Sequence, residues 1–258
     1  MPVSTRRYGR LGNELYQAAA VISYALKHNL EWSLPRTTNQ EIWNPVHFPN
    51  LYNPKWVEGR EDILINEHGH QYQEIPYREE WREKQIVLNG YWQSWKYFDW
   101  CKVEVLKAFD LPYQFDKDLC SIHVRRGDYL RYPTKHPVVT PEYLTKAMMA
   151  VNYKTDVIKF KVFSDDIKWC KDFFGNLNTN AEFIYSEGKD ELTDLIEMSW
   201  CAHNICSNST MALWGAELNM NPDKVVIVPS EDNWFGPDNK HLVVYDMYRP
   251  EWLQIKYT

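Results

Sequence analysis

Five short runs, rich in β-branched and aromatic residues, decide the fold of this chain: CSIHV (Cys120–Val124), IKFKVF (Ile158–Phe163), AEFIY (Ala181–Tyr185), HNICS (His203–Ser207) and KVVIV (Lys224–Val228). Each has the length and composition of a buried strand. Segments with helical spacing of apolar residues separate them: Pro141–Val151, Asp166–Phe174, Asp190–Cys201 and Thr210–Asn219. This alternation predicts βαβ units around a parallel sheet, whose ligands bind where the strands end.

The first half of the chain is less regular. A helix is predicted over Asn13–Asn29, after Gly9 and Gly12, and a proline-rich excursion spans residues 35–57. A polar stretch, Glu58–Lys84, follows before strand-like residues resume. We therefore expect an N-terminal half (1–110), a second half (111–232), and a C-terminal tail (233–258) that packs back on the body.

The composition excludes several classes of protein. Aromatic residues make up 15% of the 258-residue chain and charged residues 25%, which is typical of a folded protein with a substantial core. A net charge of −6 argues against a nucleic-acid partner. No apolar run approaches the roughly 20 residues of a membrane span, and the start lacks a signal peptide, although peripheral membrane association stays open. Five cysteines without a CxxC pair indicate free thiols, so we expect a cytoplasmic protein.

Two arginines follow the run that ends at Val124. Charged groups at the end of a buried strand are costly unless an anion meets them, and guanidinium groups bind phosphate oxygens in a bidentate way. Because side chains alternate along a strand, Arg125 and Arg126 should point to opposite faces. One is expected to face a ligand while the other packs and forms an ion pair, for which Asp128 is available.

An acidic pair, Asp165 and Asp166, follows the run that ends at Phe163. Such carboxylates accept hydrogen bonds from a nucleotide base or ribose, or cap the next helix. Adjacent acids also suit Mg²⁺ or Mn²⁺, as in metal-dependent nucleotide-sugar transferases. Since the arginines already supply the positive charge that a metal would bring, no metal site is expected.

Two other turns precede helices. The turn Gly9-Arg10-Leu11-Gly12-Asn13 lacks both the third glycine of a dinucleotide fingerprint and the lysine of a Walker loop. Asn208-Ser209-Thr210 places hydroxyl groups at a helix start, where they either cap the helix or join its free N–H groups in binding an anion.

Taken together, these motifs resemble glycosyltransferase family 11, whose members transfer fucose from GDP-fucose. The resemblance lies in segments that span nearly the whole chain: GRLGNELYQAAA (Gly9–Ala20), LNGYWQSWKYF (Leu88–Phe98), SIHVRRGDY (Ser121–Tyr129), FSDDIKWCKDFF (Phe163–Phe174), DLIEMSWCAHNICSNSTMALWGAELN (Asp194–Asn219) and NWF (Asn233–Phe235). HxRRGDY is shared with related fucosyltransferase families, whereas the second and fifth segments point to this one. The resemblance implies an α/β, GT-B-like fold of two Rossmann-like halves with parallel sheets, with the donor site at the strand C-terminal ends of the second half.

The resemblance also implies an inverting transfer of L-fucose from GDP-β-L-fucose to a glycan hydroxyl, the 2-OH in an α-1,2 linkage, without a metal or other cofactor. In that picture Arg125 contacts the β-phosphate and stabilises the departing GDP, and Arg126 has a secondary role. The other donor contacts it implies are His123 and Asp165 for guanosine, Ser209 and Thr210 for phosphate, and Asn13 near the sugar–phosphate junction.

The base and the acceptor site are open at this point. Asp128 is the predicted general base, with His136 and Glu14 as alternatives, and its rival role is an ion pair that holds Arg126. Aromatic faces suit the C–H surfaces of sugars, so the predicted acceptor contacts are Trp43, Trp56 and Trp92 in the first half. A core position is the alternative for Trp92.

The chain departs from the family pattern at Glu14 and in the segment that follows Asn208-Ser209-Thr210, and two other functions stay open. Glu14 stands where the family usually has Gln, so its carboxylate should point away from the diphosphate or pair with Arg10. The chain is alternatively a metal-dependent transferase that uses Asp165 and Asp166, or a non-catalytic carbohydrate-binding protein on a decayed transferase scaffold.

Overall fold

The computed structural model describes residues 1–35, 48–52, 55, 57 and 59–257. The chain divides into two compact units: Met1–Leu111 with Val243–Met247, and Pro112–Leu242 with Tyr248–Thr258. The first break lies one residue from the expected position. The expected tail of residues 233–258 differs from what the structure shows, because its residues are shared between both units and form no separate piece.

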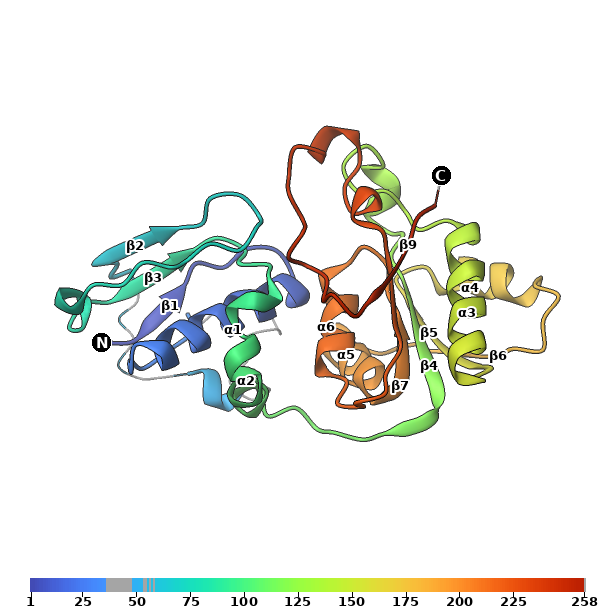
Figure 1. Ribbon diagram of the computed structural model, residues 1–258, viewed down its shortest axis with the longest axis horizontal. Helices are drawn as coiled ribbons and strands as arrows, with labels where there is room; N and C mark the ends of the chain where they lie inside the picture. The colour runs from blue at the N-terminus through green and yellow to red at the C-terminus, as the bar shows by residue number, and fades with distance from the viewer. Residues whose placement is uncertain (36–47, 53–54, 56, 58, 258) are drawn as a thin grey trace. The chain divides into compact units, whose positions relative to one another are not determined.

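The second unit is built on a six-stranded parallel sheet in the order β6-β5-β4-β7-β8-β9 (Figure 1). Its strands are β4 (Asp116–Val124), β5 (Lys159–Ser164), β6 (Glu182–Tyr185), β7 (Cys201–Ile205), β8 (Val226–Pro229) and β9 (Leu253–Ile255). The first five contain or overlap the predicted runs. Strand β9 was not predicted, because its three residues, LQI, are too few to show an apolar run or an alternating pattern.

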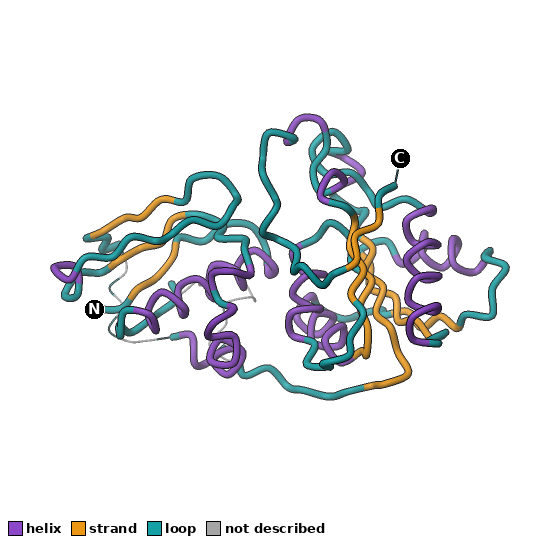
Figure 2. Tube along the Cα trace, viewed as in Figure 1, coloured by secondary structure: helices purple, strands orange, loops and turns teal. Residues whose placement is uncertain are grey.

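Helices cover both faces of this sheet: α3 (Pro141–Thr155), α4 (Ile167–Gly175), α5 (Glu191–Trp200) and α6 (Thr210–Leu218). In Figures 1 and 2, α3 and α4 lie on one side of the strands and α5 and α6 on the other. Alternate residues of β4 serve the two faces: Ile122 belongs to the apolar core with α3 and α4, whereas Ser121 accepts a hydrogen bond from Asn204. Helix α5 runs into β7 without a turn, so β7 starts two residues before its predicted position.

The first unit has a smaller parallel sheet of three strands, in the order β1-β3-β2. Its elements are β1 (Val3–Thr5), β2 (Ile63–Asn66), β3 (Ile86–Asn89) and the helices α1 (Leu11–Lys27) and α2 (Lys102–Phe109). The run of alanines and aliphatic residues in α1 is almost wholly buried, so this helix forms the centre of the unit's core. Strand β2 lies inside the polar stretch where no strand was expected.

Both sheets are parallel throughout, which confirms the prediction of an α/β chain with two parallel-sheet halves. All five cysteines are buried and unbridged, as predicted. Within the described residues, every helix is too short or too polar to cross a membrane.

Candidate functional site

The carboxyl ends of three neighbouring strands bring most of the predicted site residues of the second unit together. Val124 at the end of β4 pairs with Ser164 at the end of β5, and Ile122 pairs with Ile205 at the end of β7. The loops that leave these strands carry Arg125, Asp165 and Ser207. Parallel pairing therefore places arginines, carboxylates and hydroxyls at one edge of the sheet.

Arg125 is held between two carboxylates. Its Nε and Nη2 atoms lie 2.8 and 2.7 Å from Oδ1 of Asp128, and its Nη1 lies 3.1 Å from Oδ2 of Asp165. The guanidinium is mostly buried and lies 5.8 Å from the centre of the Tyr129 ring. The arginine is thereby fixed and oriented before any ligand binds, which suits a group that must meet a charge developing during a reaction.

Arg126 packs on the opposite face. Its guanidinium lies 3.9 Å from the ring centre of Trp169 in α4, and its Nε donates to Oδ2 of Asp166 at 3.0 Å. Asp166 also caps α4 by accepting the N–H of Trp169. The two arginines thus diverge as strand alternation predicts. The rival role of Asp128, an ion pair with Arg126, is not the one seen: Asp166 pairs with Arg126, because the turn at Gly127 and Asp128 folds back onto Arg125.

Asp165 ties the loops after β4 and β5 together. Besides contacting Arg125, it accepts the backbone N–H of Arg126 at 2.8 Å. A Cβ atom at Gly127 would come within 2.7 Å of the same carboxylate, so only glycine leaves room for this approach. Asp165 is predicted to contact guanosine, and in the structure it already has two protein partners.

His123 lies at the end of β4 and is buried. Its Nδ1 is 2.8 Å from Oγ of Ser207, which follows β7. Burial, reinforced by the charge of Arg125, lowers the pKa of His123 to about 4, so the ring is neutral at pH 7. A neutral imidazole can donate or accept a hydrogen bond, as contact with a nucleoside requires. Ser207 was not among the predicted residues.

The Asn208-Ser209-Thr210 turn has two roles. Asn208 is buried, and its Nδ2 donates to the carbonyls of Pro137 at 2.8 Å and Trp234 at 3.1 Å. The Asn208 side chain therefore links the backbone segments that contain Pro137 and Trp234. Ser209 is the N-cap residue of α6 but its side chain makes no capping bond, and Thr210 opens the helix; both are partly exposed. The start of α6 thus offers backbone N–H groups and hydroxyls to an anion.

An aromatic stack adjoins Arg125 and was not predicted as a unit. Tyr129 stacks on His136 with ring centres 4.9 Å apart, and His136 lies 5.8 Å from the Phe235 ring. The Tyr129 hydroxyl donates to the carbonyl of Asn208 at 2.9 Å. Burial lowers the pKa of His136, which leaves it neutral and able to accept a proton at pH 7. In the sequence, Tyr129 closes the SIHVRRGDY motif, His136 is an alternative base and Phe235 closes the NWF motif, but nothing indicated that the three rings meet.

Asn13 and Glu14 lie in the first unit, at the start of α1. The Asn13 Oδ1 accepts from Nε2 of Gln93 at 2.7 Å. Gly9 has φ +78°, and any larger residue there would collide with the Asn13 side chain. The Glu14 carboxylate is buried and pairs with Arg7.

Of the three predicted acceptor tryptophans, Trp92 alone lies among the described residues. Trp43 and Trp56 lie outside the described residues. Trp92 is 0% exposed, so it cannot offer its face to a sugar here, and it takes the core position that was its alternative. Its left-handed φ of 54° is held because the Glu67 carboxylate accepts the N–H groups of Tyr91 and Trp92 at 2.6 and 2.9 Å.

The carboxylates of the site are engaged with arginines. Asp165 and Asp166 each form an ion pair at 3.0–3.1 Å, which occupies oxygens that a divalent ion would need. Among the described residues, no three His, Cys, Asp or Glu side chains are grouped as metal ligands.

Three known proteins show what the chain is similar to. An Escherichia coli O-antigen biosynthesis glycosyltransferase is 36% identical over 50% of this chain and 43% of its own length. An E. coli alpha-1,2-colitosyltransferase is 27% identical over 66% of this chain and 63% of its own length. The chain thus matches less than two thirds of either bacterial relative. The mouse galactoside alpha-(1,2)-fucosyltransferase 2 is 23% identical over 96% of this chain and 76% of its own length.

A family model gives the more general result. The model described as glycosyl transferase family 11 matches residues 110–256, which is more than half of the chain and nearly all of the second unit. This segment contains the arginine pair, the acidic pair and the Asn208–Thr210 turn. The family predicted from the motifs is confirmed: the chain belongs to glycosyltransferase family 11.

Proposed function

We propose that this chain transfers L-fucose from GDP-β-L-fucose to the 2-hydroxyl of a galactoside-containing glycan, with inversion and without a metal ion. The observation that carries the proposal is the fixed guanidinium of Arg125 at the end of β4, flanked by the start of α6. The name of the mouse relative supports a galactoside acceptor and an α-1,2 linkage.

In the proposed reaction, the bond between the anomeric carbon of fucose and the β-phosphate oxygen breaks, and negative charge develops on GDP. Arg125 stabilises that charge, helped by the N–H groups and hydroxyls of Ser209 and Thr210 at the helix start. The carboxylates of Asp128 and Asp165 keep the guanidinium in place, so it needs no reorganisation as charge develops. Arg126, packed on Trp169, stabilises the loop.

The acceptor hydroxyl attacks the opposite face of the sugar and gives up its proton. Asp128 is the predicted base, but both of its contacts with Arg125 go to one oxygen, Oδ1, so its second oxygen is the atom for proton transfer. His136, neutral and stacked on Tyr129, is the second candidate. Comparing Asp128→Asn with His136→Gln separates them: the true base gives the larger fall in kcat and removes the acidic limb of the pH profile.

The test of the proposal is sugar transfer by purified protein, with radiolabelled GDP-fucose, galactosides and EDTA. Transfer to the 2-hydroxyl, located by NMR of the product, is the expected result. An obligatory divalent ion would favour the alternative based on Asp165 and Asp166. Binding of glycans without GDP binding in calorimetry would favour a non-catalytic protein. GDP-colitose belongs in the assay because one relative is named for colitose transfer, and exclusive use of it would replace fucose as the donor sugar.

A further inference from the structure

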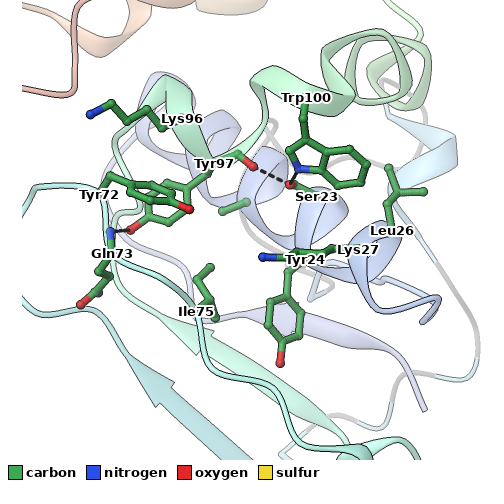
Figure 3. Close-up of a pocket in the computed structure, with 11 residues that line it drawn as sticks. Ser23, Tyr24, Leu26, Lys27, Tyr72, Gln73, Ile75, Lys96, Tyr97 and Trp100 are labelled. Atoms are coloured by element: carbon green, nitrogen blue, oxygen red, sulfur yellow. Dashed lines mark hydrogen bonds between the residues drawn. The ribbon is translucent and has the colours of Figure 1, made fainter.

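A cavity of about 420 Å³ lies in the first unit, and none of the predicted donor, catalytic or acceptor residues lines it. Figure 3 shows it between α1, the loop of residues 72–75 and the turn that includes Trp100. Its volume falls within the range of about 300–1,000 Å³ found for small-molecule sites. Aromatic side chains form its walls.

Trp100 forms one wall. It is 59% exposed, yet its ring is fixed because Nε1 donates to Oγ of Ser23 at 2.9 Å. Ser23 in turn donates to the backbone carbonyl of Tyr97. An exposed tryptophan ordinarily moves among rotamers, whereas this one is held in place before any ligand arrives, which lowers the entropic cost of binding.

Tyr72 forms the facing wall. It is 40% exposed and packs on Tyr97, with ring centres 4.9 Å apart. Its backbone N–H donates to Oδ2 of Asp246 at 2.9 Å, and Asp246 also pairs with Lys96. The Tyr97 hydroxyl accepts the N–H of Gln73 at 3.1 Å. Two half-exposed aromatic rings are therefore anchored on opposite sides of the same space.

Lys27 supplies charge inside this space. Figure 3 shows its ammonium group directed between the two walls, above Ile75. Its ion pair with Glu74 is long, 3.8 Å, and both side chains are more than half exposed, so little energy is lost when a ligand replaces it. The ammonium offers three hydrogen-bond donors.

We infer that this cavity binds a sugar ring of the acceptor glycan. A pyranose has an apolar C–H face and a rim of hydroxyl groups, and the cavity offers aromatic walls for the first and the Lys27 ammonium for the second. Ser23, Tyr24 and Gln73 add polar groups to the lining, which distinguishes the cavity from a purely apolar pocket for a lipid chain. The inference rests on the proposed function, because the glycan it names is the acceptor of that reaction.

Three variants test the inference. Trp100→Ala removes one wall, Trp100→Phe keeps an aromatic face without the Nε1 hydrogen bond, and Lys27→Met removes the ammonium. The matched control is Tyr153→Ala, which deletes an 89% exposed aromatic ring from α3 in the second unit. Binding is measured on an array of natural oligosaccharides without donor, and GDP binding is measured separately by calorimetry.

We expect Trp100→Ala to reduce glycan binding at least tenfold, Lys27→Met several-fold and Trp100→Phe less than either. GDP affinity and melting temperature should stay at wild-type values, and in the transfer assay KM for the glycan should rise with kcat little changed. Unchanged glycan binding in Trp100→Ala, or no glycan bound by the wild type, overturns the inference even if fucose is transferred. Wild-type glycan binding that depends on Trp100, without fucose transfer, overturns the proposed function alone.

Discussion

Each unit has a parallel sheet of its own, but the two units differ in where their charged and aromatic side chains gather. In the second unit, charged groups gather at the strand ends, where two arginines meet three carboxylates beside the start of α6. In the first unit, a recess lies between α1 and its neighbouring loops and is walled by aromatic rings. The family model matches residues 110–256, which include nearly all of the second unit, and its match begins at residue 110. The match to the family model thus coincides with the unit that carries the charged site.

The largest expected effect comes from Arg125. Arg125→Ala should lower kcat about 10³-fold, because removing one preorganised donor to a developing negative charge typically costs 10²–10³-fold. The melting temperature should change little. Arg126→Ala is the matched variant: its packing on Trp169 predicts a greater loss of stability and a smaller loss of rate. Near-normal turnover in Arg125→Ala would show that Arg125 does not stabilise the departing GDP.

Each unit also contains one buried carboxylate paired with an arginine. Arg249→Met in the second unit leaves Glu217 without that partner, and Arg7→Met does the same to Glu14 in the first. Each change should cost about 3–5 kcal/mol of unfolding free energy, since it removes the arginine from a buried ion pair. Denaturant unfolding followed by circular dichroism measures it, with the exposed Lys256–Asp232 pair as control; Lys256→Ala should cost under about 1 kcal/mol. If both methionine variants shift a single common transition, the units unfold as one.

His123 gives the second unit a pH dependence. The pKa of His123 is about 4 in the folded chain, below the ordinary 6.5. Between pH 6.5 and 4, His123 is therefore protonated in the unfolded chain but stays neutral in the folded chain. Stability is then lost as the pH falls from 6.5 towards 4, by about 2 kcal/mol at around pH 5. His123→Asn should lack this part of the slope. Parallel stability curves for the two proteins would show that His123 is not held neutral.

The smallest effect is expected at Gly127. A methyl group there must displace the Asp165 carboxylate, so Gly127→Ala should reduce kcat/KM roughly tenfold, given that misplacing a reacting group by about 1 Å can cost about 100-fold. Gly175→Ala, at the end of α4 with open space around it, is the control and should leave the kinetics unchanged. Equal kinetics in the two variants would mean that Asp165 has no role in positioning.

The sequence predicted regular parts of the molecule well and local connections poorly. Strand runs such as that ending at Val124 carry their own periodicity, so the sheet and the edge bearing Arg125 were predictable. The partner of Asp128 was not, because a turn decides which neighbour its side chain meets, and adjacency in sequence does not give the direction of a turn. Trp92 was misjudged for the same reason: the carboxylate that holds its left-handed backbone comes from Glu67, 25 residues away.

The division of the C-terminal segment has a consequence for how the chain can be cut. Because Val243–Met247 belongs to the first unit, the backbone passes between the units three times, after Leu111, Leu242 and Met247. No single cleavage separates them: a fragment ending at Leu111 lacks Asp246, which anchors Tyr72 and Lys96. Exchanging the first unit between relatives therefore requires a two-part graft that carries this pentapeptide as well.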